Sequence, residues 1–319
     1  MGEIGYNRSR YRTFWCIPHM DSHENDTETE RNQMTYEDFL MHLEQKIMGK
    51  LEEGETVKRV RILKNNNVKL DGFSYCVEGH RERPTVYVNQ YYQEELLEDT
   101  VDEIADMVLK LQRESRLFPS HGVDQLMDFE KMRKRIHCRL ISRDKNEELL
   151  KDVPWLPWLD LAIVFHFQIP ERILEHATAL IYTSHMEYWG VTIEDIYTAA
   201  AENMSEIQVF LEPMEHFLGT CGFDPLSSGM HILSNCQKEY GAAVIINPQV
   251  QRMCLQRLGE SYYVLPSSVH ELLLLPESLA VGPFELEQLI QEVNTTCVRQ
   301  EEYLSGHAYF YSEETGVLK

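Results

Sequence analysis

The chain has 319 residues, 43% hydrophobic and 26% charged, a composition typical of a globular protein long enough for two or three packed units. Its formal charge of −22 disfavours non-specific binding to nucleic acid or to anionic membranes, since like charges repel. We therefore expect a folded acidic protein that has no membrane partner, and for which nucleic acid is a disfavoured partner.

Seven cysteines are scattered along the chain, without a C-x-x-C pair or any Cys/His spacing typical of zinc sites. An odd, dispersed set of thiols is typical of a reducing cytosol. The first twenty residues lack the apolar segment of a secretory signal, and the most apolar run, 158–169, is too short to span a bilayer. The sequence predicts a cytoplasmic protein with no metal site.

Residues 1–33 have no apolar periodicity, so we expect a flexible arm or an N-terminal extension from a wrongly chosen start codon. Thr35 and Asp38 then form a capping-box pattern at the start of a helix. Its apolar residues recur every four positions, at Phe39, Leu43, Ile47 and Leu51. Folded structure is therefore expected to begin at about Met34.

A change to period two after Gly54 predicts three antiparallel strands, at 57–64, 68–77 and 84–89. Three asparagines at 65–67 are suited to the first turn, since asparagine tolerates a positive φ. A helix from Thr100 follows, with Val101, Ile104, Val108 and Leu111 on one face. These elements predict a first unit over residues 34–115.

Residues 116–122 are read as a connector to a second unit, 123–204. A helix with apolar residues at Leu126, Phe129, Met132 and Ile136 is expected to lead into a strand near Cys138. Pro154 and Pro157 forbid a helix and are expected to place Trp155 and Trp158 at a corner. Further expected elements are strands at 159–169 and 177–183, a short helix ending at Gly190 and a capped helix at 192–203.

Residues 205–229 are interpreted as an irregular connector to a last unit, 230–319. Pro248 and Gly259 mark the two ends of a helix in that unit. The other expected elements are strands at 242–247, 262–266, 271–276 and 308–311, and a helix at 284–296. The predicted class is α+β, with two or three packed units, mainly antiparallel sheets and short helices.

Three strings carry a family resemblance: "MTYEDF", "SRDKNEELLKDVPWLPWLDLAIVFHF" and "GAAVIINPQVQRMCLQRLGESYYVLPSSVHELLLLPE". In this order they resemble an uncharacterised bacterial family, domain of unknown function 5688, over roughly residues 34–319. The resemblance implies no activity, ligand or catalytic residue.

The segment "YYVLPSSVHELLLLP" places Ser268, His270 and Glu271 between two apolar runs. Alternation along a strand would put Glu271 on the face opposite His270, where it cannot orient the imidazole, and no G-x-S-x-G elbow is present. We therefore interpret it as a hairpin turn. The S-x-x-K match at 142–145 is interpreted as chance, with Asp144 or Asn146 as an N-cap.

The strongest departure from the acidic composition is the basic stretch, defined as residues 131–145, with seven cations and a single acid, Asp144. It is either a solvated or internally paired face or a binding site for an anionic partner. A protein is favoured over nucleic acid, since no aromatic stacking platform interleaves the cations. The candidate binding residues are Lys131, Arg133, Lys134, Arg135, Arg139 and Arg143. Lys58, Arg59, Arg61 and Lys64 form a weaker second basic group.

No catalytic constellation and no glycine-rich phosphate loop is visible, so no cofactor is expected and the catalytic residues stay unknown. We expect a cytoplasmic, non-enzymatic binding or interaction protein with a protein partner. One rival is a hydrolase of unrecognised type with a histidine base. Another is an anionic-ligand or nucleic-acid binder that uses the basic stretch. The oligomeric state is left open.

Overall fold

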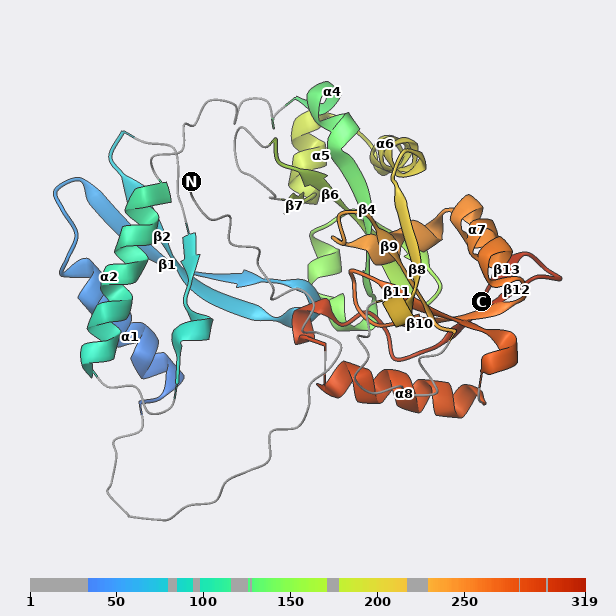
Figure 1. Cartoon of the computed structure of the whole chain (residues 1–319). Helices are drawn as coiled ribbons and strands as arrows, with labels where there is room; N and C mark the ends of the chain where they lie inside the picture. The colour runs from blue at the N-terminus through green and yellow to red at the C-terminus, as the bar shows by residue number, and fades with distance from the viewer. Residues whose placement is uncertain are drawn as a thin grey trace, which may run out of the picture.

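The computed structural model describes residues 34–79, 85–93, 98–115, 126, 128–170, 178–216, 229–280, 282–296 and 298–319. These residues form three antiparallel sheets with helices packed against them, which confirms the predicted α+β class (Figure 1). The predicted arm, 1–33, and the predicted connector, 116–122, lie outside the described residues.

The N-terminal body consists of α1, α2 and the first sheet. Helices α1 (Tyr36–Met48) and α2 (Glu98–Ser115) lie side by side against β1 (Glu55–Leu63), β2 (Lys69–Val77) and β3 (Thr85–Tyr87) (Figure 1). The expected cap is present, since the Thr35 side chain accepts from the Asp38 backbone N–H. The core of this body includes the buried residues Phe39, Leu43, Ile47, Phe73, Tyr75, Val101 and Val108.

Leu111 is the one residue of the expected stripe on α2 that does not enter the core, since it is 39% exposed. The buried face follows steps of four residues instead, through Ala105 and Leu109 on one row and Val108 and Gln112 on the other. The buried Gln112 amide donates to the Phe73 carbonyl oxygen at 2.6 Å. Because Gln112 is polar, an apolar pattern alone does not identify this buried face.

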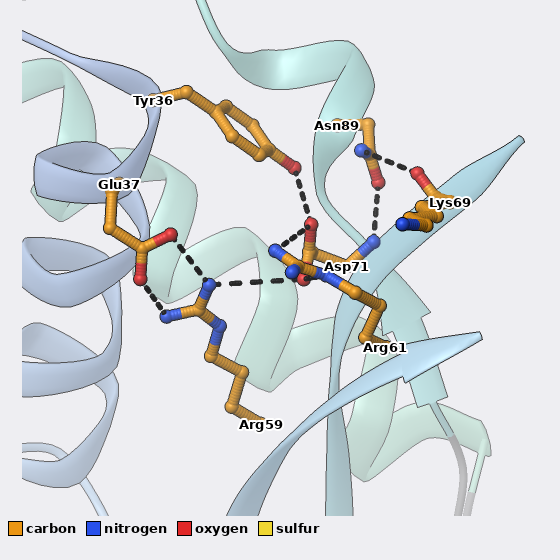
Figure 2. A network of polar contacts seen from close by, with 7 residues as sticks. All are labelled: Tyr36, Glu37, Arg59, Arg61, Lys69, Asp71 and Asn89. Atoms are coloured by element: carbon orange, nitrogen blue, oxygen red, sulfur yellow. Dashed lines mark hydrogen bonds and ion pairs between the residues drawn. The ribbon is translucent and has the colours of Figure 1, made fainter. Parts of the chain in front are cut away.

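A polar cluster ties α1 to the β1–β2 hairpin around the buried carboxylate of Asp71 (Figure 2). Arg61 donates to Asp71 from Nε at 2.8 Å, and the Tyr36 hydroxyl donates at 3.2 Å. Arg59 pairs with Glu37 at 2.7 Å, and the Asn89 side chain accepts from the Asp71 backbone N–H. Two cations of the weaker basic group are thus paired with carboxylates.

The second sheet has the order β4–β6–β5, with β7 also pairing with β6. Its strands are β4 (Ile136–Ser142), β5 (Trp155–Trp158), β6 (Leu161–Gln168) and β7 (Thr178–Leu180). Preceding it is α4 (Phe129–Met132), which continues as a 3-10 turn to Arg135. Ile136 is therefore the first residue of a strand, and its predicted place in the helix is wrong.

Trp155 and Trp158 do not form the expected corner, because both lie within β5. Pro157 is tolerated there since β5 lies at an edge, where one side of the strand needs no ladder hydrogen bond. The turn into β6 places Leu159 at φ 53°. The prolines thus excluded a helix correctly but did not exclude an edge strand.

Two capped helices follow the second sheet as predicted. Helix α5 (Thr183–Trp189) ends at Gly190 in the left-handed conformation, φ 68°. Helix α6 (Ile193–Ser205) begins with a reciprocal capping box between Thr192 and Asp195. It packs its apolar face on β4, so its C-terminal end lies beside the start of that strand.

The third sheet has the order β13–β12–β10–β11–β9–β8. Its strands are β8 (Val209–Pro213), β9 (His231–Asn235), β10 (Tyr262–Pro266), β11 (Leu272–Pro276), β12 (Tyr309–Ser312) and β13 (Val317–Leu318). Helix α8 (Pro283–Thr296) covers one face, and α7 (Pro248–Leu258) belongs to the core on the other (Figure 1). Burial on both faces explains the unbroken leucine run of β11.

Two predictions in this region are wrong. Residues 209–213 of the supposed irregular connector form β8, the edge strand of the third sheet. The expected strand at 242–247 is instead a 3-10 helix, η9 (Gly241–Ile246), which is buried at five consecutive positions. A short, wholly apolar run has no period, so it cannot distinguish a strand from a buried helical turn.

One hydrophobic core runs through the predicted units 123–204 and 230–319, from Met132 to Leu318. The N-terminal body has its own core and joins the rest through the tip of the β1–β2 hairpin (Figure 1). Leu63 near that tip packs against a buried apolar cluster that includes Ile141, Ala162 and Val164 of the second sheet. The division into three units stays a prediction.

The asparagines of the hairpin tip form hydrogen bonds with the rest of the chain. Asn66, at φ 59°, forms two hydrogen bonds with Asn146. The backbone N–H of Asn66 donates to Asn146 Oδ1 at 2.7 Å, and Asn146 Nδ2 donates to Asn66 Oδ1 at 2.9 Å. The Asn66 amide also donates to the carbonyl oxygens of Gln300 and Tyr303. Neither Asp144 nor Asn146 is an N-cap, so that prediction is wrong.

Candidate ligand pocket

A pocket of about 380 Å³ opens where the second sheet meets the end of α6 and the segment 235–244. This volume is within the range of small-molecule sites. Most of its lining is polar and uncharged. Besides two histidines, the lining includes Gln168, Thr178, Asn203, Gln208, Asn235 and Gln237.

The two histidines of the pocket, His137 and His166, are direct partners across β4 and β6. Directly opposite residues of an antiparallel pair share a face, and the ring centroids are 5.8 Å apart. The Nδ1 atoms of both are buried, and neither has a hydrogen-bond partner among the described residues. A buried polar atom without a partner is costly, so the fold holds these two nitrogens at some cost in stability.

Burial lowers the pKa of His137, and it lowers the pKa of His166 well below its ordinary value. The charge of neighbouring Arg139 lowers the pKa of His166 further. Both imidazoles are therefore neutral near pH 7. Each presents one donor and one acceptor nitrogen, which suits hydrogen bonding to an uncharged ligand.

Tyr240 forms the wall of the pocket next to His166, with ring centroids 4.9 Å apart. Its backbone lies at φ 51°, a left-handed conformation that side chains other than glycine rarely adopt. The Asn235 side chain fixes this segment, since it bonds both the N–H and the carbonyl oxygen of Glu239. A Cβ at Gly241 would lie 2.6 Å from the Asn235 backbone nitrogen, so the close approach requires glycine.

Three charged side chains line the pocket: Lys134, Glu206 and Glu239. With two acids to one base, the lining offers no excess of positive charge for an anion. Burial raises the pKa of the lining residue Cys138 to about 12, so its thiol stays protonated and is a poor nucleophile.

The segment around Ser268 and His270 is the turn of a hairpin, as the sequence predicted. Strands β10 and β11 pair from Tyr262 opposite Pro276 to Pro266 opposite Leu272, and residues 267–271 connect them. His270 Nδ1 accepts from the Tyr240 backbone N–H at 3.1 Å, and its Nε2 lies 3.9 Å from Glu302. The hydroxyl of Ser268 accepts from the backbone N–H of His270, so it faces the main chain rather than the imidazole.

This arrangement does not support the hydrolase hypothesis at this position. A base must accept the proton of its nucleophile, but His270 Nδ1 is already occupied by a backbone N–H. The carboxylate near the imidazole is Glu302, from a distant part of the chain, and not Glu271. His270 thus links the hairpin turn to the Tyr240 segment.

The basic stretch is divided between ion pairs and the pocket region. Lys131 pairs with Asp128 at 2.9 Å, and Arg133 pairs with Glu202 at 3.0 Å. Arg143 lies 3.7 Å from Asp144. Three of the six candidate binding residues therefore have carboxylate partners within the chain.

The other three candidates lie nearer the pocket. Lys134 lines it directly, and Arg135 ends the 3-10 turn that leads into β4. Arg139 follows His137 by two residues and so lies on the same face of the strand, with its guanidinium 4.1 Å from the centre of the Tyr240 ring. Whether an anionic partner binds these residues stays a prediction.

Folding brings to the basic stretch aromatic rings that its own sequence lacks. No aromatic residue interleaves the cations in the sequence, but folding places Tyr240 against Arg139 and Tyr303 against Lys145. The tyrosines come from segments about a hundred residues or more away along the chain. Aromatic contacts to a basic stretch are therefore not visible from local sequence.

Sequence reasoning missed His137, His166 and Tyr240. A signal existed for the two histidines, because each interrupts a nearly continuous apolar run, "IHCRLI" and "LAIVFHF". Their pairing depends on the register of β4 and β6, which the sequence does not give. No local pattern marks Tyr240, since its position follows from the Asn235 contacts.

Two features are absent from the part of the chain that the structure describes. No three histidine, cysteine, aspartate or glutamate side chains in that part of the chain gather so as to hold a metal ion. None of the helices there is both long enough and apolar enough to cross a membrane.

The chain was compared with known proteins and families. No curated protein and no solved structure matches it. The model of a family of unknown function, DUF5688, matches residues 36–313, which is most of the chain and agrees with the resemblance seen in the three sequence strings. The chain therefore belongs to the DUF5688 family.

Proposed function

We propose that the protein is a non-enzymatic binding protein that takes a small, uncharged, polar molecule into the pocket beside His137 and His166. The observation that carries this proposal is the lining of the pocket, in which two neutral imidazoles lie among uncharged amide and hydroxyl side chains. A ligand with hydroxyl or amide groups can donate to and accept from such side chains. Sugars, polyols and nucleosides have this chemistry.

The charge and size of the pocket support the same class of ligand. Its volume of about 380 Å³ accommodates a molecule of that size. The imidazoles are neutral because burial lowers their pKa values, so they neither attract an anion nor repel a neutral molecule. The amide side chains around them are donors and acceptors at once.

We propose a cytoplasmic location on a separate ground. The described cysteines Cys138, Cys236 and Cys254 are free thiols, which is typical of a reducing compartment. A protein partner also stays a proposal, based on the basic stretch.

The binding function can be tested with a variant that obstructs the pocket rim. Thr178 lines the pocket and is partly exposed, so Thr178→Trp is expected to fill the entrance while the fold survives. Thr56→Trp, at an exposed position on β1, is the matched control. Each protein is incubated with the uncharged small-molecule fraction of a cell extract, washed and denatured, and the released molecules are identified by mass spectrometry.

The expected result is one compound enriched by the wild type and by Thr56→Trp but not by Thr178→Trp. Equal enrichment by all three proteins would show that the pocket is not the binding site. Absence of any enriched uncharged compound would contradict the proposal.

A further inference from the structure

The wall of the pocket at residues 238–240 has a backbone conformation that needs support. Lys238 and Tyr240 lie at φ 53° and 51°, in the left-handed region that residues other than glycine rarely adopt. Such a conformation persists only where the surrounding contacts hold it. Because Tyr240 lines the pocket, the shape of the pocket depends on these contacts.

Two side chains hold this segment by hydrogen bonds. The Asn235 amide bonds the N–H and the carbonyl oxygen of Glu239 at 3.1 Å and 2.8 Å. His270 Nδ1 accepts from the Tyr240 backbone N–H at 3.1 Å, and the rings of these two residues are stacked with centroids 5.3 Å apart. An amide does not titrate, whereas an imidazole ordinarily changes its charge between about pH 5 and pH 8. Only the second of these contacts therefore responds to pH.

Protonation of His270 removes its contact with the Tyr240 backbone. In the neutral ring Nδ1 is the acceptor, so the single ring proton lies on Nε2. A second proton must bind at Nδ1, which then faces the Tyr240 N–H, and two donors cannot bond to each other. The His270 side chain is 31% exposed, so this proton can come from water.

The Glu302 carboxylate favours the protonated state of His270. It lies 3.9 Å from His270 Nε2, and an opposite charge at about 4–6 Å favours the charged form of a titrating group. Burial raises the pKa of Glu302 itself, with Arg299 opposing this shift and Glu301 adding to it. The imidazolium thus has a carboxylate partner to replace the contact that it loses.

The other charged groups around this turn act in both directions. Burial raises the pKa of Glu271, the next residue in the chain, and Lys238 opposes that shift. The Arg139 guanidinium lies 4.1 Å from the centre of the Tyr240 ring on which His270 stacks, so it repels a protonated imidazole. This repulsion is relieved when the Tyr240 ring moves away from His270.

The backbone of His270 stays fixed in either state. Its carbonyl oxygen accepts from Ser234 Oγ at 2.7 Å, and its N–H donates to Ser268 Oγ at 3.1 Å. Neither of these bonds involves the imidazole. The change on protonation is therefore confined to the imidazole and to the strained segment that it supports.

We propose that His270 positions the Tyr240 wall of the pocket only while its Nδ1 is unprotonated, so that the pocket holds its ligand near neutral pH and releases it in acid. Release of a ligand rests on the proposed function. Movement of the wall does not, since it is measured on the protein alone.

Hydrogen exchange followed by nuclear magnetic resonance tests the movement on the ligand-free protein. Protection of the Tyr240 amide, corrected for the intrinsic exchange rate at each pH, is compared at pH 7.5 and pH 5.5. The Ile181 amide, which donates to the Phe165 carbonyl oxygen at 2.8 Å, reports opening of the second sheet. The test variant is His270→Asn, which keeps an acceptor oxygen one bond from Cγ, as Nδ1 is, but does not titrate. The matched control is His307→Asn, at a side chain that is 66% exposed.

In the wild type and in His307→Asn, we expect acid to reduce the protection of the Tyr240 amide at least about fivefold more than that of Ile181, since one hydrogen bond is lost. In His270→Asn the two amides should change alike, within about twofold. Glu302→Gln should move the wild-type change to lower pH, and it decides if His270→Asn does not fold. A Tyr240 amide that follows Ile181 in the wild type, an extra loss that survives in His270→Asn, or an unshifted change in Glu302→Gln would overturn the proposal.

Release is measured separately with the uncharged small-molecule fraction of a cell extract. Wild type and His270→Asn are loaded at pH 7.5 and washed at pH 5.5, and the wild type is expected to lose at least about fivefold more of the enriched compound. Equal loss from both proteins would overturn the proposed release. Absence of any enriched compound at pH 7.5 contradicts the proposed function instead, and the exchange of the Tyr240 amide then decides whether His270 positions the wall.

Discussion

Asn146→Ala should destabilise the docked hairpin more than any exposed substitution near it. Asn146 is fully buried and makes three hydrogen bonds, two with Asn66 and one from Nδ2 to the Ser142 carbonyl oxygen at 2.7 Å. Its removal leaves the Asn66 N–H, the Asn66 Oδ1 and the Ser142 oxygen without partners. Each such group costs about 1–3 kcal/mol, so with partial relaxation we expect a loss of about 3–5 kcal/mol.

Urea unfolding followed by circular dichroism measures this loss. The matched control is Asn67→Gly, because Asn67 is exposed and lies at φ 59°, where glycine is free of strain. The control is expected to change the free energy of unfolding by less than about 1 kcal/mol. If Asn146→Ala costs no more than the control, the asparagine contacts do not hold the hairpin and the reasoning is refuted.

Three other predictions concern pH, an ion pair and the basic stretch. Because burial lowers the pKa values of His137 and His166, the unfolded chain binds more protons than the folded chain at acid pH. The free energy of unfolding is therefore unaffected by these histidines above about pH 6.5 and falls below it. The fall is at most about 1.4 kcal/mol per pH unit for each histidine. Thermal melts from pH 7.5 to 5.5 measure the fall, and His166→Phe should reduce its slope. Arg113 lowers the pKa of Glu55 to about 2 by a hydrogen bond to its carboxylate. Glu55→Gln should therefore lower the free energy of unfolding at pH 7, measured in urea, by about 1–3 kcal/mol. An unchanged free energy would show that the pair is not stabilising. Reversing Arg133, Lys134 and Arg135 to glutamate should abolish co-purification of an anionic protein partner while the far-ultraviolet spectrum is kept; retained capture would show that the stretch is not the interface.

Elements with local signals were predictable from sequence. Thr35 and Thr192 begin helices because their side chains cap the first turn, and Gly190 and Gly259 end helices at positive φ. The hairpin of β10 and β11 follows from two apolar runs around "PSS". Each of these depends on residues within a few positions of one another, so single-sequence reasoning could find them.

Features that depend on distant contacts were not predictable. The turn at η9 (Gly241–Ile246) is apolar throughout, and its conformation follows from the close packing of Gly241 against Ser234 and Asn235. Asn146 resembles a helix cap in the sequence but bonds to Asn66, eighty residues away. The pairing of His137 with His166 requires the register of two strands. The candidate site is built from such contacts, which is why the sequence revealed so little of it.

The central claim, that the pocket binds an uncharged polar molecule at two neutral histidines, is tested most directly by the imidazole nitrogens themselves. In ¹⁵N-labelled protein, the resonances of His137 and His166 are assigned by substitution and followed during titration with cell-extract fractions separated into uncharged and charged molecules. We predict that the uncharged fraction shifts these two residues saturably and leaves the exposed His216 and His307 unchanged. A shift caused by the charged fraction alone, or no shift of His137 and His166 with either fraction, would contradict the account.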